Sequence, residues 1–219
     1  MSKRKNKQKE QEELQAQKQT RALLIVICAA VLIPLLERDG ALHVLFEVRE
    51  QGILQGGEIC FPGGHLEPGE TLAEAAVRET REELLLAPEQ IELLAPLHIL
   101  GGHGSREIHS FLGLLRSYAG TRDPAEVAST FTVPLDWLLR NPPEVYEGRL
   151  VVEPGEDFPY GLIPGGRNYP WGVVRRQFYF YRRPEGVIWG LTAELLTEFL
   201  RLLGAGRPET PGGSPWSEL

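Results

Sequence analysis

The chain has 219 residues, of which 42% are hydrophobic and 24% are charged, and this composition is typical of a globular domain that can bury a core. Its 23 Lys and Arg against 30 Asp and Glu give a net charge of −7, which argues against a general nucleic-acid-binding protein. Only two cysteines occur, Cys28 and Cys60. A disulfide framework and a cysteine-based zinc site are therefore disfavoured, and we expect a reducing, cytoplasmic location.

The N-terminal part of the chain changes character at residue 22. Residues 1–21 carry seven Lys and Arg against three Glu and are predicted to form a polar, charged extension with no face to bury. Residues 22–36, "ALLIVICAAVLIPLL", are an apolar run that contains Pro34 and falls short of the roughly 20 residues of a membrane-spanning helix. A buried strand is therefore favoured, and a membrane or export segment is the alternative.

A hairpin and a short strand are predicted next. Asp39-Gly40 is a tight-turn signal between residues 22–36 and a second strand over residues 42–49. The alternating pattern of that strand predicts one buried face. A further strand over residues 57–64 ends in a Pro-Gly-Gly turn. The face predicted to be buried consists of Leu42, Val44, Phe46 and Val48.

The clearest helix follows this turn. Thr71 and Glu74 form a capping box, and the helix is predicted to run over residues 72–86 and to stop before Pro88. Its apolar positions predict a core-facing stripe separate from its acidic residues. The stripe consists of Ala73, Val77, Thr80 and Leu84.

The second half of the chain is predicted to contain fewer regular elements. Residues 123–139 read as a loop leading into a short helix, and residues 141–175, rich in Pro, Gly and aromatics, as an ordered irregular insertion. A last helix is predicted to end at Gly204. Its core stripe is Leu191, Leu195, Phe199 and Leu202. Strands are predicted at residues 91–100, 108–116 and 177–183. The whole predicts an α/β or α+β domain over residues 22–204, followed by a flexible Gly/Pro/Ser-rich tail over 205–219.

The stretch "RETREE" at residues 78–83 places Glu79, Glu82 and Glu83 within about 100° of helix arc. Like charges at these spacings repel and destabilise a bare helix. Either the residues form a solvated face, or their hard carboxylate oxygens hold Mg²⁺ or Mn²⁺. The helix by itself favours the solvated face.

The residues before the helix reverse that preference. Gly64, five residues, Glu70, seven residues and then "RETREELLL" match the pattern G-x5-E-x7-R-E-U-x-E-E-x-G-U, where U is a bulky aliphatic residue. The chain thereby resembles the Nudix hydrolase family. Two positions depart from the pattern: Thr80 occupies a U position and Leu85 the final glycine position. Leucine is costly at positive φ, so we expect the helix end to take another conformation.

Other segments resemble the coenzyme A pyrophosphatase subgroup of this family. "LFEVR" at residues 45–49 and "GEICFPGG" at 57–64 are similar to its L-L-T-x-R element and G-x3-F-P-G-G motif. "EVASTFTVPLDWLL", "GEDFPYGLIPGG" and "IWGLTAELL" extend the resemblance to roughly residues 28–203. The resemblance implies an α/β/α sandwich around a central mixed sheet.

The resemblance also implies roles for individual residues. Glu79, Glu82 and Glu83 would ligate the metal together with the backbone carbonyl of Gly64, while Arg78 would orient the glutamates and pair with Glu70. The general base stays open among Glu82, Glu83 and Glu126, and Glu126 is equally well explained as an exposed charge. Arg49 and the segment from Gly57 to Phe61, with Gly63 and Gly64, would contact the substrate, although Phe61 is equally well explained as core.

The implied substrate is a small nucleotide derivative. The leading hypothesis is a Mg²⁺- or Mn²⁺-dependent enzyme that splits coenzyme A into adenosine 3′,5′-bisphosphate and 4′-phosphopantetheine. The alternatives are a hydrolase of ADP-ribose or another nucleoside diphosphate derivative, and a catalytically silent ligand-binding module. No nucleic-acid or membrane partner is expected, and a homodimer is kept open. Stacking faces and cations in the insertion fit an adenine nucleotide, or else form a lid that packs on the core; they are Phe158, Tyr160, Tyr169, Trp171, Arg167, Arg175 and Arg176.

Overall fold

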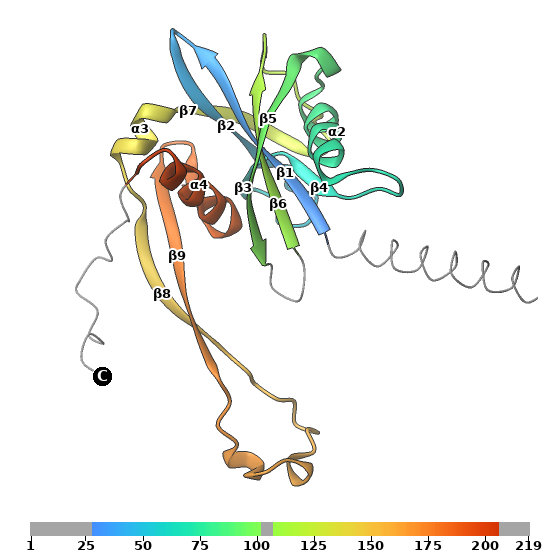
Figure 1. Ribbon diagram of the computed structural model, residues 1–219, viewed down its shortest axis with the longest axis vertical. Helices are drawn as coiled ribbons and strands as arrows, with labels where there is room; N and C mark the ends of the chain where they lie inside the picture. Colours follow the sequence, from blue (N-terminus) through green and yellow to red (C-terminus); the bar gives the residue numbers. More distant parts are fainter. Residues whose placement is uncertain (1–27, 102–106, 206–219) are drawn as a thin grey trace, which may run out of the picture.

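The computed structural model describes residues 28–101 and 107–205. The predictions for residues 1–21, for 22–27 and for the tail beyond 205 fall outside the described residues. Within them, a mixed seven-stranded sheet forms the body of the molecule and a three-stranded antiparallel sheet lies beside it (Figure 1). The strands are β1 (Cys28–Arg38), β2 (Ala41–Arg49), β3 (Ile59–Cys60), β4 (Gly63–His65), β5 (Ile91–Gly101), β6 (Glu107–Leu115), β7 (Val127–Pro134), β8 (Glu144–Val151), β9 (Val173–Arg183) and β10 (Gly186–Ile188). The helices are α2 (Leu72–Leu84), α3 (Leu135–Arg140) and α4 (Gly190–Leu202), with short 3₁₀ turns at Pro88–Gln90, Tyr160–Leu162 and Gly166–Asn168.

Strand β1 is the centre of the seven-stranded sheet. It pairs antiparallel with β2 and β4 and parallel with β6, in the order β3-β2-β1-β6-β5, with β7 on the far edge of β2. The predicted tight turn joins β1 to β2, with positive φ at both Asp39 and Gly40. Because β1 is enclosed on both edges and both faces, the described part of the apolar run forms a buried strand, as the sequence predicted.

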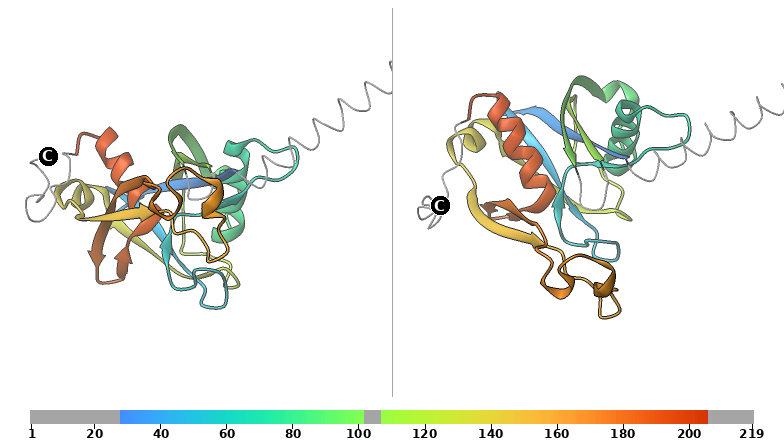
Figure 2. Two further views of the ribbon diagram at one scale, coloured as in Figure 1. Left: turned by 90° about the horizontal axis from the view of Figure 1, so that it is seen from below. Right: turned by 60° about the horizontal axis from the view of Figure 1, so that its bottom comes forward.

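Helices cover both faces of this sheet. One buried cluster lies between the sheet and α4, and a second lies between the sheet and α2 (Figure 2). Strand β2 contributes to both, because Val44 and Phe46 face α4 whereas Leu45 faces α2. The predicted α/β/α sandwich is therefore confirmed. The predicted single buried face of β2 is wrong, because Leu45 and Glu47 are as deeply buried as Phe46, and Leu42 is exposed.

Helix α2 begins at the predicted capping box, in which the Glu74 amide donates to Thr71 Oγ1 (3.2 Å) and the Thr71 amide to Glu74 Oε2 (2.8 Å). Its buried side is rotated from the predicted stripe toward the acidic residues, and Ala73 and Val77 are only half-buried. The reason is that α2 packs on β1 and also on β4. The buried residues of the helix are Ala75, Ala76, Thr80, Glu83 and Leu84.

The end of α2 contradicts the prediction for Leu85, which does adopt the left-handed conformation (φ 52°, ψ 50°). The conformation costs about 1–2 kcal/mol for a residue with a Cβ. It is offset because the turn lets the Leu86 amide donate to the Arg81 carbonyl and buries the Leu86 side chain. The Asp123 amide and the Thr121 hydroxyl satisfy the carbonyls of Glu83 and Leu84, so the helix end keeps its hydrogen bonds.

Two predicted irregular regions contain strands. The loop predicted before α3 includes β7, which pairs along β2, and its Val, Thr and Phe residues suit a strand. The predicted insertion begins with β8, which pairs along its whole length with β9. Gly148 obscured this strand, yet a glycine is required there because the Phe178 ring of β9 lies where a side chain would start.

Strands β8 and β9 form a long arm that extends away from the body (Figure 1). Its tip holds the aromatic residues of the insertion, which pack edge-to-face on one another at ring-centroid distances of 4.9–5.6 Å. The Arg167 guanidinium lies 4.5 Å from the centroid of Tyr160. The tip is thus a small packed unit with its own ring contacts.

Helix α4 covers the sheet face opposite α2 and ends before Gly204, which has φ 92°. Leu195 and Phe199 are buried as predicted, together with Ala193, Leu196 and Leu200. The prediction was wrong for the two ends of the stripe, since Leu191 and Leu202 are exposed. These two residues lie at the two ends of a helix that is only 13 residues long, where the side chains extend beyond the sheet.

Candidate functional site

A cleft of about 680 Å³ lies between the start of β1, the β3–β4 turn, α2 and the first residues of α4. Seven residues predicted to form the site line it, and they come from four separate segments of the chain. Four predicted residues do not line it: Gly57, Glu70, Arg78 and Glu82. The residues brought together are Arg49, Phe61, Gly63, Gly64, Glu79, Glu83 and Glu126.

Glu83 is the most deeply buried carboxylate that lines the cleft, with 4% of its surface exposed. Its Oε2 accepts a hydrogen bond from the Gly63 amide at 2.9 Å, so the glycine turn and α2 are joined at this point. Burial raises the pKa of Glu83 to about 8, an effect that the Gly63 hydrogen bond reduces and that the charges of Glu79 and Glu126 increase.

Glu79 lies against the other glycine of the turn. A Cβ at Gly64 would collide with the Glu79 carboxylate, so only glycine lets the backbone pass this close. Burial raises the pKa of Glu79, and its contact with Arg78 (Nη1 to Oε1, 3.0 Å) opposes the rise. The carboxylates of Glu79 and Glu83 and the backbone of the turn thus share the floor of the cleft.

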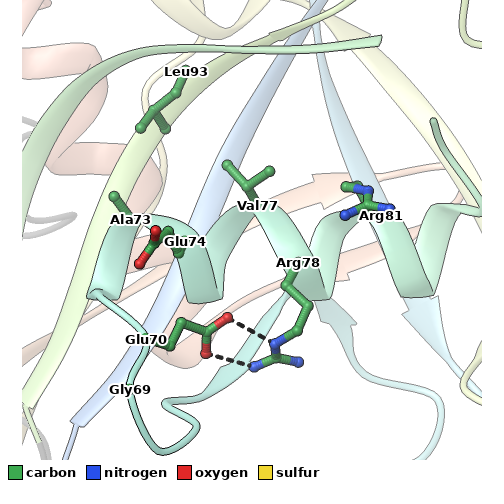
Figure 3. A pocket seen from close by; sticks show the side chains of 8 residues that line it. All are labelled: Gly69, Glu70, Ala73, Glu74, Val77, Arg78, Arg81 and Leu93. Atoms are coloured by element: carbon green, nitrogen blue, oxygen red, sulfur yellow. Dashed lines mark hydrogen bonds and ion pairs between the residues drawn. The ribbon is translucent and has the colours of Figure 1, made fainter. Parts of the chain in front are cut away.

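Arg78 ties the acidic residues together from outside the cleft. Its Nε and Nη2 donate to the two Glu70 oxygens at 2.9 and 3.1 Å (Figure 3). Its Nη2 also donates to the His65 carbonyl at 3.0 Å. Its Nη1 lies 3.1 Å from Oε2 of Glu82, which is 63% exposed. Hydrogen bonds from Arg78 lower the pKa of Glu70, and Glu70 in turn raises that of Arg78. Arg78 therefore anchors the loop before α2 and contacts both Glu79 and Glu82.

A second concave surface, of about 620 Å³, lies on the outer face of α2 and shares no residue with the cleft (Figure 3). Glu70 and Arg78 belong to it and are occupied with each other. Ala73 and Val77, which were predicted to face the core, line this surface with Leu93. Arg78 thus lines the outer surface while its Nη1 contacts Glu79 of the cleft, so it connects the two.

The side chains fit a divalent cation in kind but are not arranged as a cage. Among the described residues, no three His, Cys, Asp or Glu side chains converge closely enough to surround an ion. Three carboxylates beside a glycine turn are the oxygen donors that Mg²⁺ and Mn²⁺ prefer. Glu82 is exposed, and its carboxylate and that of Glu79 lie 3.1 and 3.0 Å from the same Arg78 nitrogen, Nη1.

Glu47 was not singled out from the sequence. It occupies the threonine position of the L-L-T-x-R-like element, is 1% exposed, and has one carboxylate oxygen with no hydrogen-bond partner. Its other oxygen lies 4.0 Å from Cys60 Sγ. Burial and then the charge of Glu83 raise the pKa of Glu47 well above its usual range, and burial raises that of the Cys60 thiol to about 12. A charged residue on a strand that is apolar on both faces was the available signal.

Replacing Glu47 by Met is expected to stabilise the fold by about 1–3 kcal/mol, because a buried carboxyl oxygen without a partner incurs a desolvation penalty that an apolar side chain of similar volume avoids. Denaturant unfolding of the variant and of the parent chain measures the difference. Lower stability in the variant would mean that the Glu47 carboxyl makes a favourable interaction in solution.

The metal-free protein is expected to lose stability as the pH rises. Glu83 has a folded pKa of about 8 against an ordinary 4.5, so between these values the folded state binds more protons than the unfolded state and the free energy of unfolding decreases with pH. A divalent cation prefers the ionised carboxylates, so its stabilising effect should increase over the same range. Thermal unfolding at about pH 6 and pH 8, with EDTA or with MgCl₂, tests this; a cation effect of equal size at both pH values would contradict it.

Comparisons with known proteins agree with the family resemblance of the sequence. The NUDIX domain model matches residues 27–156. A mouse protein, peroxisomal coenzyme A diphosphatase NUDT7, is 36% identical over 132 residues, which are 59% of this chain and 55% of that protein, so the chain spans little more than half of this relative. Nudix hydrolase 3 of Caenorhabditis elegans is 30% identical over 182 residues, 80% of this chain and 72% of that protein.

Among solved structures, the C. elegans Ap4A hydrolase binary complex matches 51% of this chain and 83% of that chain, with 22% identity and a TM-score of 0.44. This similarity is too low to bear on the substrate. In the described ranges, no helix is long and apolar enough to cross a membrane.

Proposed function

Because the chain belongs to the Nudix hydrolase family, we propose that it is a divalent-metal-dependent pyrophosphohydrolase acting on coenzyme A or its acyl thioesters. The observation that carries the proposal is the meeting of Glu79, Glu83 and Glu126 with the Gly63-Gly64 turn in one cleft. The coenzyme A part rests on the resemblance of the "LFEVR" and "GEICFPGG" segments and on the relative named as a coenzyme A diphosphatase.

Glu79, Glu82 and Glu83 would hold Mg²⁺ or Mn²⁺ with the Gly64 carbonyl, and the bound ion would neutralise the diphosphate and lower the pKa of a water molecule. The Gly63 amide keeps the Glu83 carboxylate oriented toward the cleft. Arg78, braced by both oxygens of Glu70, positions Glu79 and Glu82. In this arrangement Arg78 and Glu70 act by positioning the glutamates and do not need to touch the substrate.

Glu126 is proposed as the general base that takes a proton from the attacking water. It lines the cleft, it is exposed, and its charge acts on both Glu79 and Glu83. Its backbone is fixed, because its carbonyl accepts a hydrogen bond from the Glu50 amide at 2.8 Å. Glu82 is less suited to this role, since it lies outside the cleft and is paired with Arg78.

Arg49 is proposed to bind a phosphate of the substrate. It ends β2 at the cleft, where its Nε donates to the Leu54 carbonyl at 3.1 Å, and a guanidinium in this place suits an anion. Phe61 also lines the cleft, but it is buried and stacks on Phe46 at 5.1 Å, so its main role is in the core. A cytoplasmic location is proposed from the cysteine usage alone.

A substrate panel with Mg²⁺ or Mn²⁺ tests the proposal. Coenzyme A, acetyl-coenzyme A, ADP-ribose and diadenosine tetraphosphate are incubated with the chain and with Glu83→Gln, and the products are identified by mass spectrometry. We expect adenosine 3′,5′-bisphosphate and 4′-phosphopantetheine from coenzyme A, formed about 10²- to 10³-fold more slowly by the variant. Cleavage of ADP-ribose with coenzyme A left intact would contradict the substrate, and binding without any cleavage would indicate a silent module.

A further inference from the structure

The cleft carries an aromatic ring that no part of the proposed chemistry uses. Trp189 lines the cleft beside Leu191 and is 44% exposed. Its neighbour in the chain, Ile188, is fully buried, and Thr192 nearly so. Trp189 is therefore a large, solvent-exposed apolar side chain that lies inside a cleft, although nearby Ile188 and Thr192 are buried. Such a side chain is typical of a ligand contact.

The indole of Trp189 is rigidly mounted. Its backbone joins β10 to α4, where Ile188 pairs with Tyr181 of β9 and Gly190 turns the chain with φ 61°. Phe180 stacks nearly parallel to the indole, at 6.2 Å and 10°. Tyr146 of β8 meets Phe180 edge-on at 5.4 Å. Since the rings behind it restrict its rotation, the ring would lose little further freedom on binding a flat ligand.

The cleft therefore has two chemically different kinds of lining. Glu79, Glu83 and the glycine turn contribute polar groups, and Trp189, Leu191 and Ile108 contribute apolar surface. A ligand that matches both carries a phosphate group and a flat ring. We propose that Trp189 is the stacking platform for the purine base of the substrate; this rests on the proposed function, in which every candidate substrate carries adenine.

The aromatic residues at the arm tip, which the sequence suggested for this role, are less suited to it. Phe158, Tyr160, Tyr169 and Trp171 are engaged with one another, and none of them lines the cleft among the described residues. Trp171 thus provides a matched control: it is another partly exposed tryptophan in a ring cluster, placed away from the glutamates.

Binding of a hydrolysis-resistant probe tests the stacking. In the presence of Mg²⁺, α,β-methylene-ADP and methylenediphosphonate are compared, because the second lacks base and ribose. We expect Trp189→Leu to weaken α,β-methylene-ADP by about 5- to 150-fold, the range for loss of one base–aromatic stack, and to leave methylenediphosphonate unchanged. Equal weakening of both probes, or no change for either, would overturn the proposal.

Quenching of tryptophan fluorescence by the bound probe provides a second test, because a purely structural role of Trp189 would not produce it. Stacked adenine quenches indole emission, so the probe should quench the parent chain and Trp171→Phe but not Trp189→Phe. Trp189→Phe should keep the affinity within about 3-fold, since phenylalanine still stacks. Persistent quenching in Trp189→Phe would overturn the proposal. Because no turnover is measured, failure to cleave coenzyme A would count against the proposed function alone.

Discussion

Glu83→Gln is expected to lower turnover by about 10²- to 10³-fold while the fold stays intact, the scale for removing one group that stabilises transition-state charge. Glutamine keeps the side-chain oxygen that accepts the Gly63 amide, so the junction between the glycine turn and α2 is preserved. It removes the charge that a cation needs. The measurement is kcat at saturating metal and substrate, with circular dichroism as a check on the fold.

The same substitution should act in the opposite direction on stability. Without metal, Gln replaces a carboxylate whose charged form is disfavoured by burial, so the variant should be more stable than the parent chain at pH 8. Glu89→Gln, on the exposed turn after α2, is the matched control and should change neither quantity. Near-normal turnover in Glu83→Gln would rule out Glu83 as a metal ligand.

Gly64→Ala is expected to lower turnover by about 10²-fold with little loss of stability. The new methyl group would occupy the position of the Glu79 carboxylate and displace it, and misplacing a positioned group by about 1 Å can reduce the rate to this extent. The side chain of Glu79 can move, whereas the backbone need not. Turnover and the midpoint of denaturant unfolding, measured together, separate the two effects.

Gly63→Ala provides the contrast. Its Cβ would lie 2.6 Å from the Val31 Cα, which belongs to the central strand β1 and has no room to move. We therefore expect a large loss of stability there. Two outcomes would show that the close approach of Gly64 to Glu79 does not matter for function. One is a Gly64→Ala variant that unfolds as readily as Gly63→Ala, and the other is a Gly64→Ala variant with normal turnover.

The sequence was sufficient for the elements whose signals are local. The capping box at Thr71 and the turn at Asp39-Gly40 formed where predicted, because each depends on neighbouring residues, and the described part of the apolar run forms β1. Strands β7 and β8 were missed because they are stabilised by pairing with distant segments, although most of β9 was predicted. Leu85 was misjudged for a similar reason: the cost of its positive φ is local, but the burial of Leu86 and the bonds from residues 121–123 that offset it are not.

For the site, the spacing from Gly64 to Glu83 predicted that Gly64, Glu79 and Glu83 meet, since one turn of chain and one helix carry these three. The tertiary structure decided how they differ. Glu83 is buried against the glycine turn, Glu82 is exposed and held by Arg78, and Glu47 lies beneath them without a partner for one oxygen. It also placed Trp189 in the cleft, more than 100 residues along the chain from Glu83. Burial and long-range contact are properties of the packed chain, so spacing alone does not encode them.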